Sequence, residues 1–286
     1  MLYMKEADPN NPQTEYYDEG LKLDSRVKAF DVETLPDGFF MMVVAPRRSG
    51  KSEKIQSLLN DVYNSSKKFD YVFLFSQTNA GYEGQIPQTY RFRSMEHLPY
   101  IANKQAEVKA WNKKQKDKKK MVKSRVLIVL DDVIGEEKGE NSMRNNSMIR
   151  KLSVNGRHLG NDGVEGNGIS VILITQASKS IPKTIRMNTD IVMIGRISNR
   201  IERQTIVEEF TTLRSDRDGM KDAFKMFDSI TLSKAFRFMV ISNHIPNKRK
   251  EEDFINYFDG VYPVKQKKLF GDKLDWETEE TVNSIF

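Results

Sequence analysis

Short apolar runs separated by polar stretches are the main pattern along this chain. Each run is long enough for a strand that is buried on both faces, and the runs occupy residues 39–45, 71–75, 126–130, 169–175, 190–195 and 236–241. After the first run, apolar residues with helical spacing predict a helix over 52–64. Buried runs that alternate with helical stretches predict an α/β fold with a mostly parallel central sheet flanked by helices.

The region between the second and third runs predicts a short edge strand at 90–93 and then a long helix over about 94–120. In that helix Leu98, Ile101, Val108 and Trp111 lie three or seven residues apart, so we expect them to share one face. We expect three regions along the chain. Residues 1–34 form a polar N-terminal arm, 35–245 form the main domain, and 246–286 form a C-terminal extension that is basic and then acidic.

Composition narrows the class of protein. The 286 residues carry a net charge of +6, which permits a polyanionic partner without proving one. The chain has no cysteine, which excludes a disulfide framework and favours an intracellular protein. The apolar runs are strand-sized, so we expect no membrane span. The polar, acidic start of the chain predicts no secretory signal.

A phosphate-binding loop follows the first apolar run and precedes the first predicted helix. It comprises Ala45, Pro46, Arg47, Arg48, Ser49, Gly50, Lys51 and Ser52, and it departs from the pattern G-x-x-x-x-G-K-[ST] at its first position. Backbone N–H groups at a helix N-terminus attract an anion. Lys51 would reach the β- and γ-phosphates of ATP, and the Ser52 hydroxyl would hold Mg²⁺.

Two carboxylates, Asp131 and Asp132, follow the third apolar run. This arrangement is typical of a Walker B motif. Asp131 would hold the Mg²⁺ ion through its water shell, and Asp132 would orient and deprotonate the attacking water. Asp132 has one methylene fewer than the glutamate common at that position.

Gln176 follows the fourth run and can both donate to a phosphate oxygen and accept from the attacking water. Just before that run, Arg157 is our first choice for an arginine that reaches the nucleotide of a neighbouring subunit. Arg186, Arg196 and Arg200 are its competitors, and a surface ion pair is the alternative role for each. Ligands bind at the carboxyl ends of strands in such sheets, where the loop, the two aspartates and Gln176 fall.

Together these segments resemble a family. The strings MMVVAPRRSGKS, VLIVLDDV, NGRH before ISVILITQ, and IPKTIRMNTDIVMIG are similar to the DNA-packaging ATPases of large eukaryotic DNA viruses, the poxvirus type within the FtsK–HerA class. The resemblance covers roughly residues 30 to 245. It implies a P-loop NTPase fold of the RecA/FtsK–HerA type, with ATP and Mg²⁺ as cofactors.

The resemblance also implies a homo-oligomeric ring, a pentamer or hexamer, that translocates viral double-stranded DNA into a preformed capsid. A capsid or portal partner follows from that role. The expected location is the host cell interior at the site of virion assembly, in the cytoplasm or virus factory, with association with the virion as a further option. Secretion is not expected.

The most concentrated positive charge in the sequence is at Lys113, Lys114, Lys116, Lys118, Lys119 and Lys120. Lysines bind phosphates without reading bases, which suits non-sequence-specific binding to double-stranded DNA, although a solvated helix end has the same composition.

Two other functions stay open. A terminase-like motor without a nuclease has a similar loop, and a P-loop small-molecule kinase would need an acceptor pocket.

Overall fold

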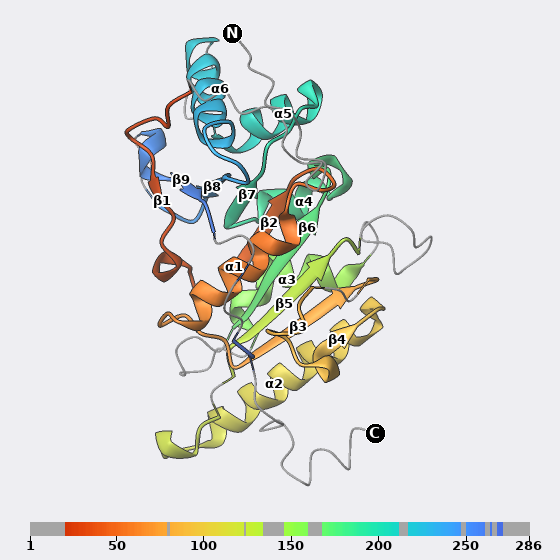
Figure 1. The fold of residues 1–286 in the computed structure, drawn as a ribbon. Helices are drawn as coiled ribbons and strands as arrows, with labels where there is room; N and C mark the ends of the chain where they lie inside the picture. The colour runs from red at the N-terminus through yellow and green to blue at the C-terminus, as the bar shows by residue number, and fades with distance from the viewer. Residues whose placement is uncertain are drawn as a thin grey trace.

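The computed structural model describes residues 21–78, 81–122, 124–133, 146–159, 168–211, 217–246, 250–260, 264 and 268–270. Within these residues one sheet runs through the molecule in the order β1-β9-β8-β7-β2-β6-β5-β3-β4 (Figure 1). Its strands are β1 (Lys28–Ala29), β2 (Phe40–Val44), β3 (Tyr71–Ser76), β4 (Arg91–Phe92), β5 (Val126–Asp131), β6 (Ile169–Thr175), β7 (Ile191–Ile194), β8 (Phe238–Ser242) and β9 (Ile255–Phe258). All neighbouring pairs are parallel except β7–β8 and β8–β9, so β8 alone among the described strands runs against the others.

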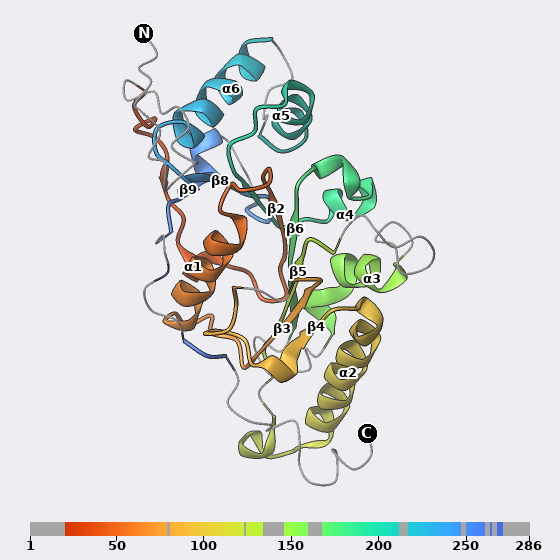
Figure 2. The ribbon, with the colours of Figure 1, turned by 45° about the vertical axis from the view of Figure 1, so that its right-hand side comes forward.

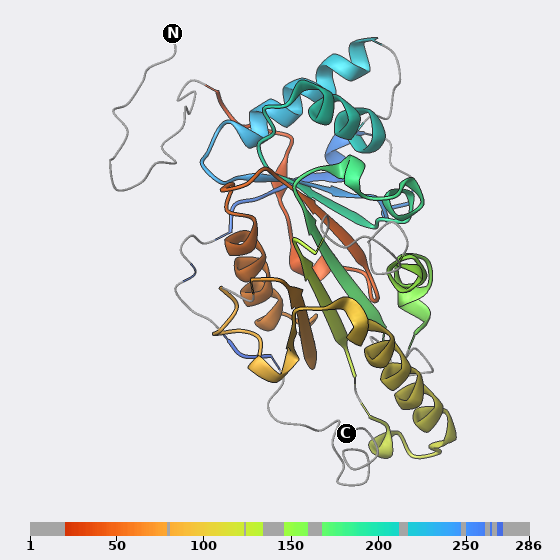
Figure 3. The same cartoon turned by 90° about the vertical axis from the view of Figure 1, so that its right-hand side faces the viewer.

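Helices cover both faces of the sheet, which explains why the strands are continuously apolar. In Figure 3, α1 (Lys51–Tyr63) lies on one face, while α2 (Leu98–Lys114) and α3 (Ser147–Asn155) lie on the other. The remaining helices are α4 (Lys183–Met187), α5 (Arg200–Ile206), which continues as a π-helical turn over Val207–Thr211, and α6 (Arg217–Thr231). Figure 2 shows α5 and α6 together above β8. The fold is the predicted P-loop-type α/β architecture.

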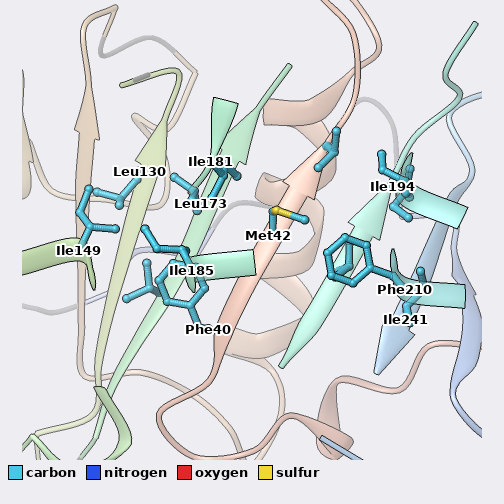
Figure 4. Packing of buried hydrophobic residues seen from close by; sticks show 14 of the residues in the cluster. Phe40, Met42, Leu130, Ile149, Leu173, Ile181, Ile185, Ile194, Phe210 and Ile241 are labelled. Atoms are coloured by element: carbon cyan, nitrogen blue, oxygen red, sulfur yellow. The ribbon is translucent and has the colours of Figure 1, made fainter. Parts of the chain in front are cut away.

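Side chains of β2 alternate between two hydrophobic cores because successive residues of a strand point to opposite faces. Phe40 and Met42 belong to the core that also contains Ile149 of α3 and Ile185 of α4, and Figure 4 shows Phe40 beside Ile185. Met41 and Val43 join the other core, which contains the apolar residues of α1. β2 contributes only apolar side chains to both cores.

The buried face of α2 differs from the prediction. Leu98 and Ile101 are buried, but Trp111 is 54% exposed and Val108 lies outside the core. Polar Gln105 and Asn112 are buried instead. The Asn112 amide donates to the carbonyl of Val122 and accepts from its N–H, both at 2.8 Å, and Gln105 binds both the carbonyl and the hydroxyl of Ser124. The second half of α2 therefore faces backbone groups of Val122 and Ser124 that need hydrogen-bond partners, and the apolar spacing could not reveal this.

Two strands lie outside the predicted main domain. β1 belongs to the expected arm of 1–34 and β9 to the expected extension of 246–286, yet β1 pairs with β9 and β9 pairs with β8. Ile255 and Phe258 are buried. The sheet thus extends beyond both expected boundaries, because two- and four-residue strands are too short to stand out as apolar runs. No helix among the described residues has the length and apolar character needed to cross a membrane.

Candidate nucleotide-binding site

The predicted site residues meet at one edge of the sheet. β2, β6 and β5 are adjacent and parallel, so their carboxyl ends lie side by side. The loop at 45–50 leaves β2, Gln176 follows β6, and Asp131 ends β5. α1 begins directly after the loop, with its N-terminus at this edge (Figure 1). A helix N-terminus above parallel strand ends is the usual place for a bound phosphate.

The backbone of the loop is tightly curved. Arg48 has φ of 59° and Gly50, the residue that precedes α1, has φ of 76°. Left-handed backbone is strained for arginine but not for glycine. The Lys51 ammonium donates to the carbonyl of Pro46 at 2.9 Å, and the Ser49 hydroxyl donates to the same carbonyl at 2.7 Å. These two bonds fix the curvature across the loop.

Two glycines, Gly195 and Gly50, are in close contact with residues in and around the loop. Ala45 replaces the first glycine of the common pattern, and its methyl group lies against Gly195, where an added Cβ would come within 2.8 Å of it. Gly50 faces the ring of Phe236, which would lie 3.0 Å from a Cβ at that position. Phe236 itself has φ of 55°. The loop therefore keeps its path with alanine at its start because the facing residue is glycine.

Lys51 is buried although it carries a charge. Burial lowers the pKa of its ammonium, and the carboxylates of Asp132 and Asp131 oppose that shift. Both carboxylates thus lie close enough to interact with the ammonium. A cation that is desolvated inside the loop attracts an anionic phosphate more strongly than an exposed one does.

Asp131 is the centre of a hydrogen-bonded group. Its Oδ2 accepts from the Ser52 hydroxyl at 3.0 Å and from the Tyr82 hydroxyl at 3.0 Å. Burial raises the pKa of the Asp131 carboxyl, and the bonds from Tyr82 and Ser52 act in the opposite direction. Tyr82 is fully buried, and burial raises the pKa of its hydroxyl well above the usual value. The phenol therefore stays protonated and donates to the carboxylate.

A Mg²⁺ ion fits the Ser52–Asp131 pair chemically. Mg²⁺ prefers oxygen ligands and is commonly held in phosphate sites by one or two protein groups together with waters and phosphate oxygens. No cluster of three or more His, Cys, Asp or Glu side chains that could hold a metal occurs within the described residues. The pair alone therefore supplies one hydroxyl and one carboxylate oxygen, which suits an ion whose other ligands are waters and phosphate oxygens.

Asp132 is exposed beside this pair and has φ of 50°. Asp tolerates left-handed backbone better than most residues, and such conformations concentrate at functional sites. The Gln176 amide lies 3.4 Å from Asp132 Oδ2, a long hydrogen bond. Asp132 and Gln176 thus face each other across the ends of β5 and β6, although they lie 44 residues apart in the sequence.

Arg157 lies elsewhere in the same chain. It belongs to the 3₁₀ turn Gly156–His158, which precedes β6, so it is at the amino end of the sheet. Its Cα is packed so closely against Gly38 that an added Cβ on that glycine would clash with it. There it lines a cavity of about 230 Å³ together with Asp190 and His244. Arg157 therefore does not join the predicted site of its own subunit.

The competing arginines have different surroundings. Arg186 forms a bidentate pair with Glu209, at 2.7 and 2.9 Å, and donates to the carbonyl of Ile181. Arg196 follows the carboxyl end of β7, and exposed Arg200 begins α5. Arg196 and Arg200 are thus at the same end of the sheet as the phosphate-binding loop.

Two buried polar residues, one in the site and one on the first turn of α1, were not predicted. Tyr82 lies in a segment whose sequence carries no motif. Lys54, on the first turn of α1, is 2% exposed, and burial lowers its pKa to about 8 while Asp259 opposes that shift. Asp259 accepts from Arg237 at 2.6 and 3.0 Å and from Lys234 at 2.9 Å. The helical spacing of 52–64 gave no indication that this lysine is buried.

The fold and the site together define a P-loop ATPase. A family model described as "Poxvirus A32 protein" matches residues 27–259, and the chain belongs to this family. The matched range begins just before β1 and ends just after β9. The predictions of a P-loop ATPase and of a viral DNA-packaging ATPase are thereby confirmed at the level of the family. A search of curated protein sequences gives no match.

Several solved structures are similar. The pCW3 conjugation coupling protein TcpA has a TM-score of 0.50 at 12% identity, over 85% of this chain and 71% of that one. EssC from Geobacillus thermodenitrificans has a TM-score of 0.50 at 12% identity, over 92% of this chain and 50% of that one. B204, the DNA-packaging ATPase from Sulfolobus turreted icosahedral virus, has a TM-score of 0.48 at 14% identity, over 80% and 100%. TcpA and EssC support the fold alone.

Burial of Lys54 predicts a specific pH dependence of stability. Its pKa of about 8 in the folded protein lies below the ordinary value of 10.5, so the unfolded chain binds more protons between these pH values. The buried ammonium therefore lowers the free energy of unfolding by its full amount below pH 8. This loss of stability declines as the pH rises toward 10.5. We expect Lys54→Met to be more stable than the wild type at pH 7 and to lose this advantage by pH 10, as measured by urea unfolding.

The matched control is Lys183→Met, which changes an exposed lysine on α4. Its difference from the wild type should be small at every pH. A Lys54→Met advantage that stays constant from pH 7 to pH 10 would contradict the assignment of the effect to titration of the buried ammonium.

Proposed function

We propose that this chain hydrolyses ATP at the edge formed by β2, β6 and β5 and uses the energy to move viral double-stranded DNA into a preformed capsid. The observation that carries the proposal is the hydrogen bond from Ser52 to Asp131, which joins the phosphate-binding loop to the Walker B strand. The working form is a homo-oligomeric ring that engages a capsid or portal partner at the site of virion assembly.

Each residue has a distinct task in this proposal. N–H groups of the loop and the N-terminus of α1 bind the phosphates, and Lys51 exchanges its bond with Pro46 for phosphate oxygens. Ser52 and Asp131 hold Mg²⁺, which, when bound, supplies neutralisation of the developing phosphate charge. Asp132 accepts the proton of the attacking water, and Gln176 orients that water and reads the γ-phosphate.

The first test separates binding from chemistry. We expect Lys51→Ala to weaken ATP binding by more than about a hundredfold, because it removes the buried cation. Asp132→Asn should retain binding and lower ATP turnover by about 10² to 10⁴, the range for a general base. Nucleotide binding by fluorescence and steady-state turnover with and without long double-stranded DNA check both expectations.

Asp37→Asn is the matched control, since Asp37 is exposed and lies before β2 at the amino end of the sheet. It should behave as the wild type does. Equal loss of ATP binding in the Lys51 and Asp132 variants would contradict the division of labour. Stimulation of turnover by an added nucleoside instead of DNA would favour a small-molecule kinase.

Arg157 remains our proposal for the residue that acts on the nucleotide of a neighbouring subunit. Its place at the amino end of the sheet supports this role only in trans, since its own phosphate-binding loop is at the opposite end. Asp190 and His244 are polar residues that line the cavity beside Arg157. Burial raises the pKa of the Asp190 carboxyl, and the hydrogen bond from the Phe40 N–H and the charge of Arg157 oppose that shift.

The expected result for Arg157→Ala is an assembled ring that binds ATP normally and turns it over at least about a hundredfold more slowly. Addition of Lys51→Ala subunits, which supply Arg157 but cannot bind ATP, should restore part of the activity. Turnover in the mixture distinguishes a trans residue from a structural one. Full activity of Arg157→Ala alone would reassign the role to Arg200 or Arg196.

The lysine cluster supports a DNA-binding surface at the amino end of the sheet. It occupies the last turn of α2 and the residues up to Lys120, where the side chains of Lys113, Lys114, Lys116, Lys119 and Lys120 are exposed. Lys109 of the same helix donates to the carbonyl of His158 at 3.2 Å. This bond places α2, one turn before the cluster, against the turn Gly156–His158 that carries Arg157.

Neutralising part of the cluster should change the salt dependence of DNA binding. The variant Lys113→Gln/Lys114→Gln/Lys119→Gln should lower the slope of log K against log salt by about 0.9 for each DNA phosphate that the protein no longer neutralises, whatever the DNA sequence. Binding to long double-stranded DNA at several salt concentrations measures this slope. The control pair Lys221→Gln/Lys225→Gln on α6 should leave it unchanged, and an equal slope in both variants would argue against this surface.

A further inference from the structure

Tyr82 is an aromatic residue with its hydroxyl inside the candidate site. It lies in the segment between β3 and β4 and is among the largest fully buried side chains of the described residues. Its hydroxyl donates to Asp131 Oδ2 at 3.0 Å across 49 residues of sequence. A buried phenol is normally placed where its O–H finds a partner, and here that partner is the Walker B carboxylate.

The carboxylate oxygen that Tyr82 contacts is also the one that Ser52 contacts. Donors from two separate elements therefore fix the orientation of the Asp131 side chain at the end of β5. Without the phenol, the buried oxygen would keep the donor from Ser52, a serine that itself is expected to bind Mg²⁺. A carboxylate that serves a metal is commonly oriented by such an outer hydrogen bond.

The segment that carries Tyr82 is held firmly against α1. The N–H groups of Gln85 and Ile86 donate to the Tyr82 carbonyl at 3.0 and 2.9 Å. The Gln85 side chain donates to the carbonyl of Gln56 in α1 at 2.6 Å, and the N–H of Phe270 donates to the Gln85 carbonyl at 2.8 Å. Gln85, Ile86 and Phe270 are fully buried. The phenol is thus placed by a segment that is buried and hydrogen-bonded to its neighbours.

We propose that Tyr82 is a positioning residue that holds the Asp131 carboxylate in the orientation needed for Mg²⁺ binding beside Ser52. This inference rests on the proposed function, because it assumes that the pair binds Mg²⁺ with a nucleotide. Tyr82 does not touch the nucleotide or the metal in this role. Its effect passes through the Ser52–Asp131 pair, because its hydroxyl donates to Asp131 Oδ2 and also interacts with the Ser52 hydroxyl.

The experiment titrates MgCl₂ against binding of a fluorescent non-hydrolysable ATP analogue to the full chain. Tyr82→Phe keeps the ring and removes only the donor, so the packing of the segment is retained. The Mg²⁺ concentration for half-maximal enhancement of binding should rise about tenfold or more, the usual cost of losing an outer-sphere partner. Binding of the same analogue in EDTA should not change, because the loop and Lys51 are intact.

Three controls make the result specific. Tyr63→Phe, on α1, removes a phenol whose ring packs against Phe270 and should leave the Mg²⁺ midpoint unchanged. In an Asp131→Asn background, Tyr82→Phe should produce no further shift, since the oxygen it orients is no longer a carboxylate. Thermal unfolding monitors whether the variant is folded.

A Tyr82→Phe midpoint equal to that of the wild type would overturn the inference, as would an equal weakening of binding with and without Mg²⁺. Absence of analogue binding by the wild type would instead overturn the proposed function. Wild-type binding that is indifferent to Mg²⁺ would contradict the assignment of Ser52 and Asp131 to the metal. The two kinds of failure are therefore distinguishable.

Discussion

The bond between the Ser52 hydroxyl and Asp131 Oδ2 connects two parts of the chain that the sequence separates by 79 residues. It exists only because β2 and β5 are parallel and lie on either side of β6, so that α1 starts level with the end of β5. The crossover from β2 into α1 in turn requires the left-handed backbone at Gly50. The order of the strands, the curvature of the loop and the contact between Ser52 and Asp131 thus depend on one another.

That geometry buries several charged groups. Lys51, Lys54 and Asp131 are all buried around the first turn of α1. A buried charge is tolerated when partners compensate it, and here the partners come from different elements: Pro46 for Lys51, Asp259 for Lys54, and Tyr82 for Asp131. Each of these buried charges costs desolvation energy, so the partners are needed to keep the turn charged.

The sequence predicted the parts of the molecule that depend on local pattern. The apolar runs of β2, β3, β5 and β6, the helix α1 and the placement of 45–52, Asp131 and Gln176 at one edge follow from run length and motif order. β1 and β9 could not be predicted because their few residues carry no periodicity. The buried face of α2 was assigned to Trp111 instead of Asn112, since polar residues that bind a neighbouring backbone look the same as solvated ones in a sequence.

For Tyr82 and Arg157, the structure adds information that the sequence motifs do not contain. Tyr82 reaches Asp131 through a long-range contact that no short pattern encodes. Arg157 is brought to the opposite end of the sheet by the close approach of Gly38, so a single subunit holds a nucleotide site at one end and a candidate trans residue at the other. A chain built in this way has a complete proposed site only when subunits are arranged with opposite ends in contact. Under the proposed trans role of Arg157, catalysis would depend on assembly, which fits a motor that should hydrolyse ATP only at the place where it packages DNA.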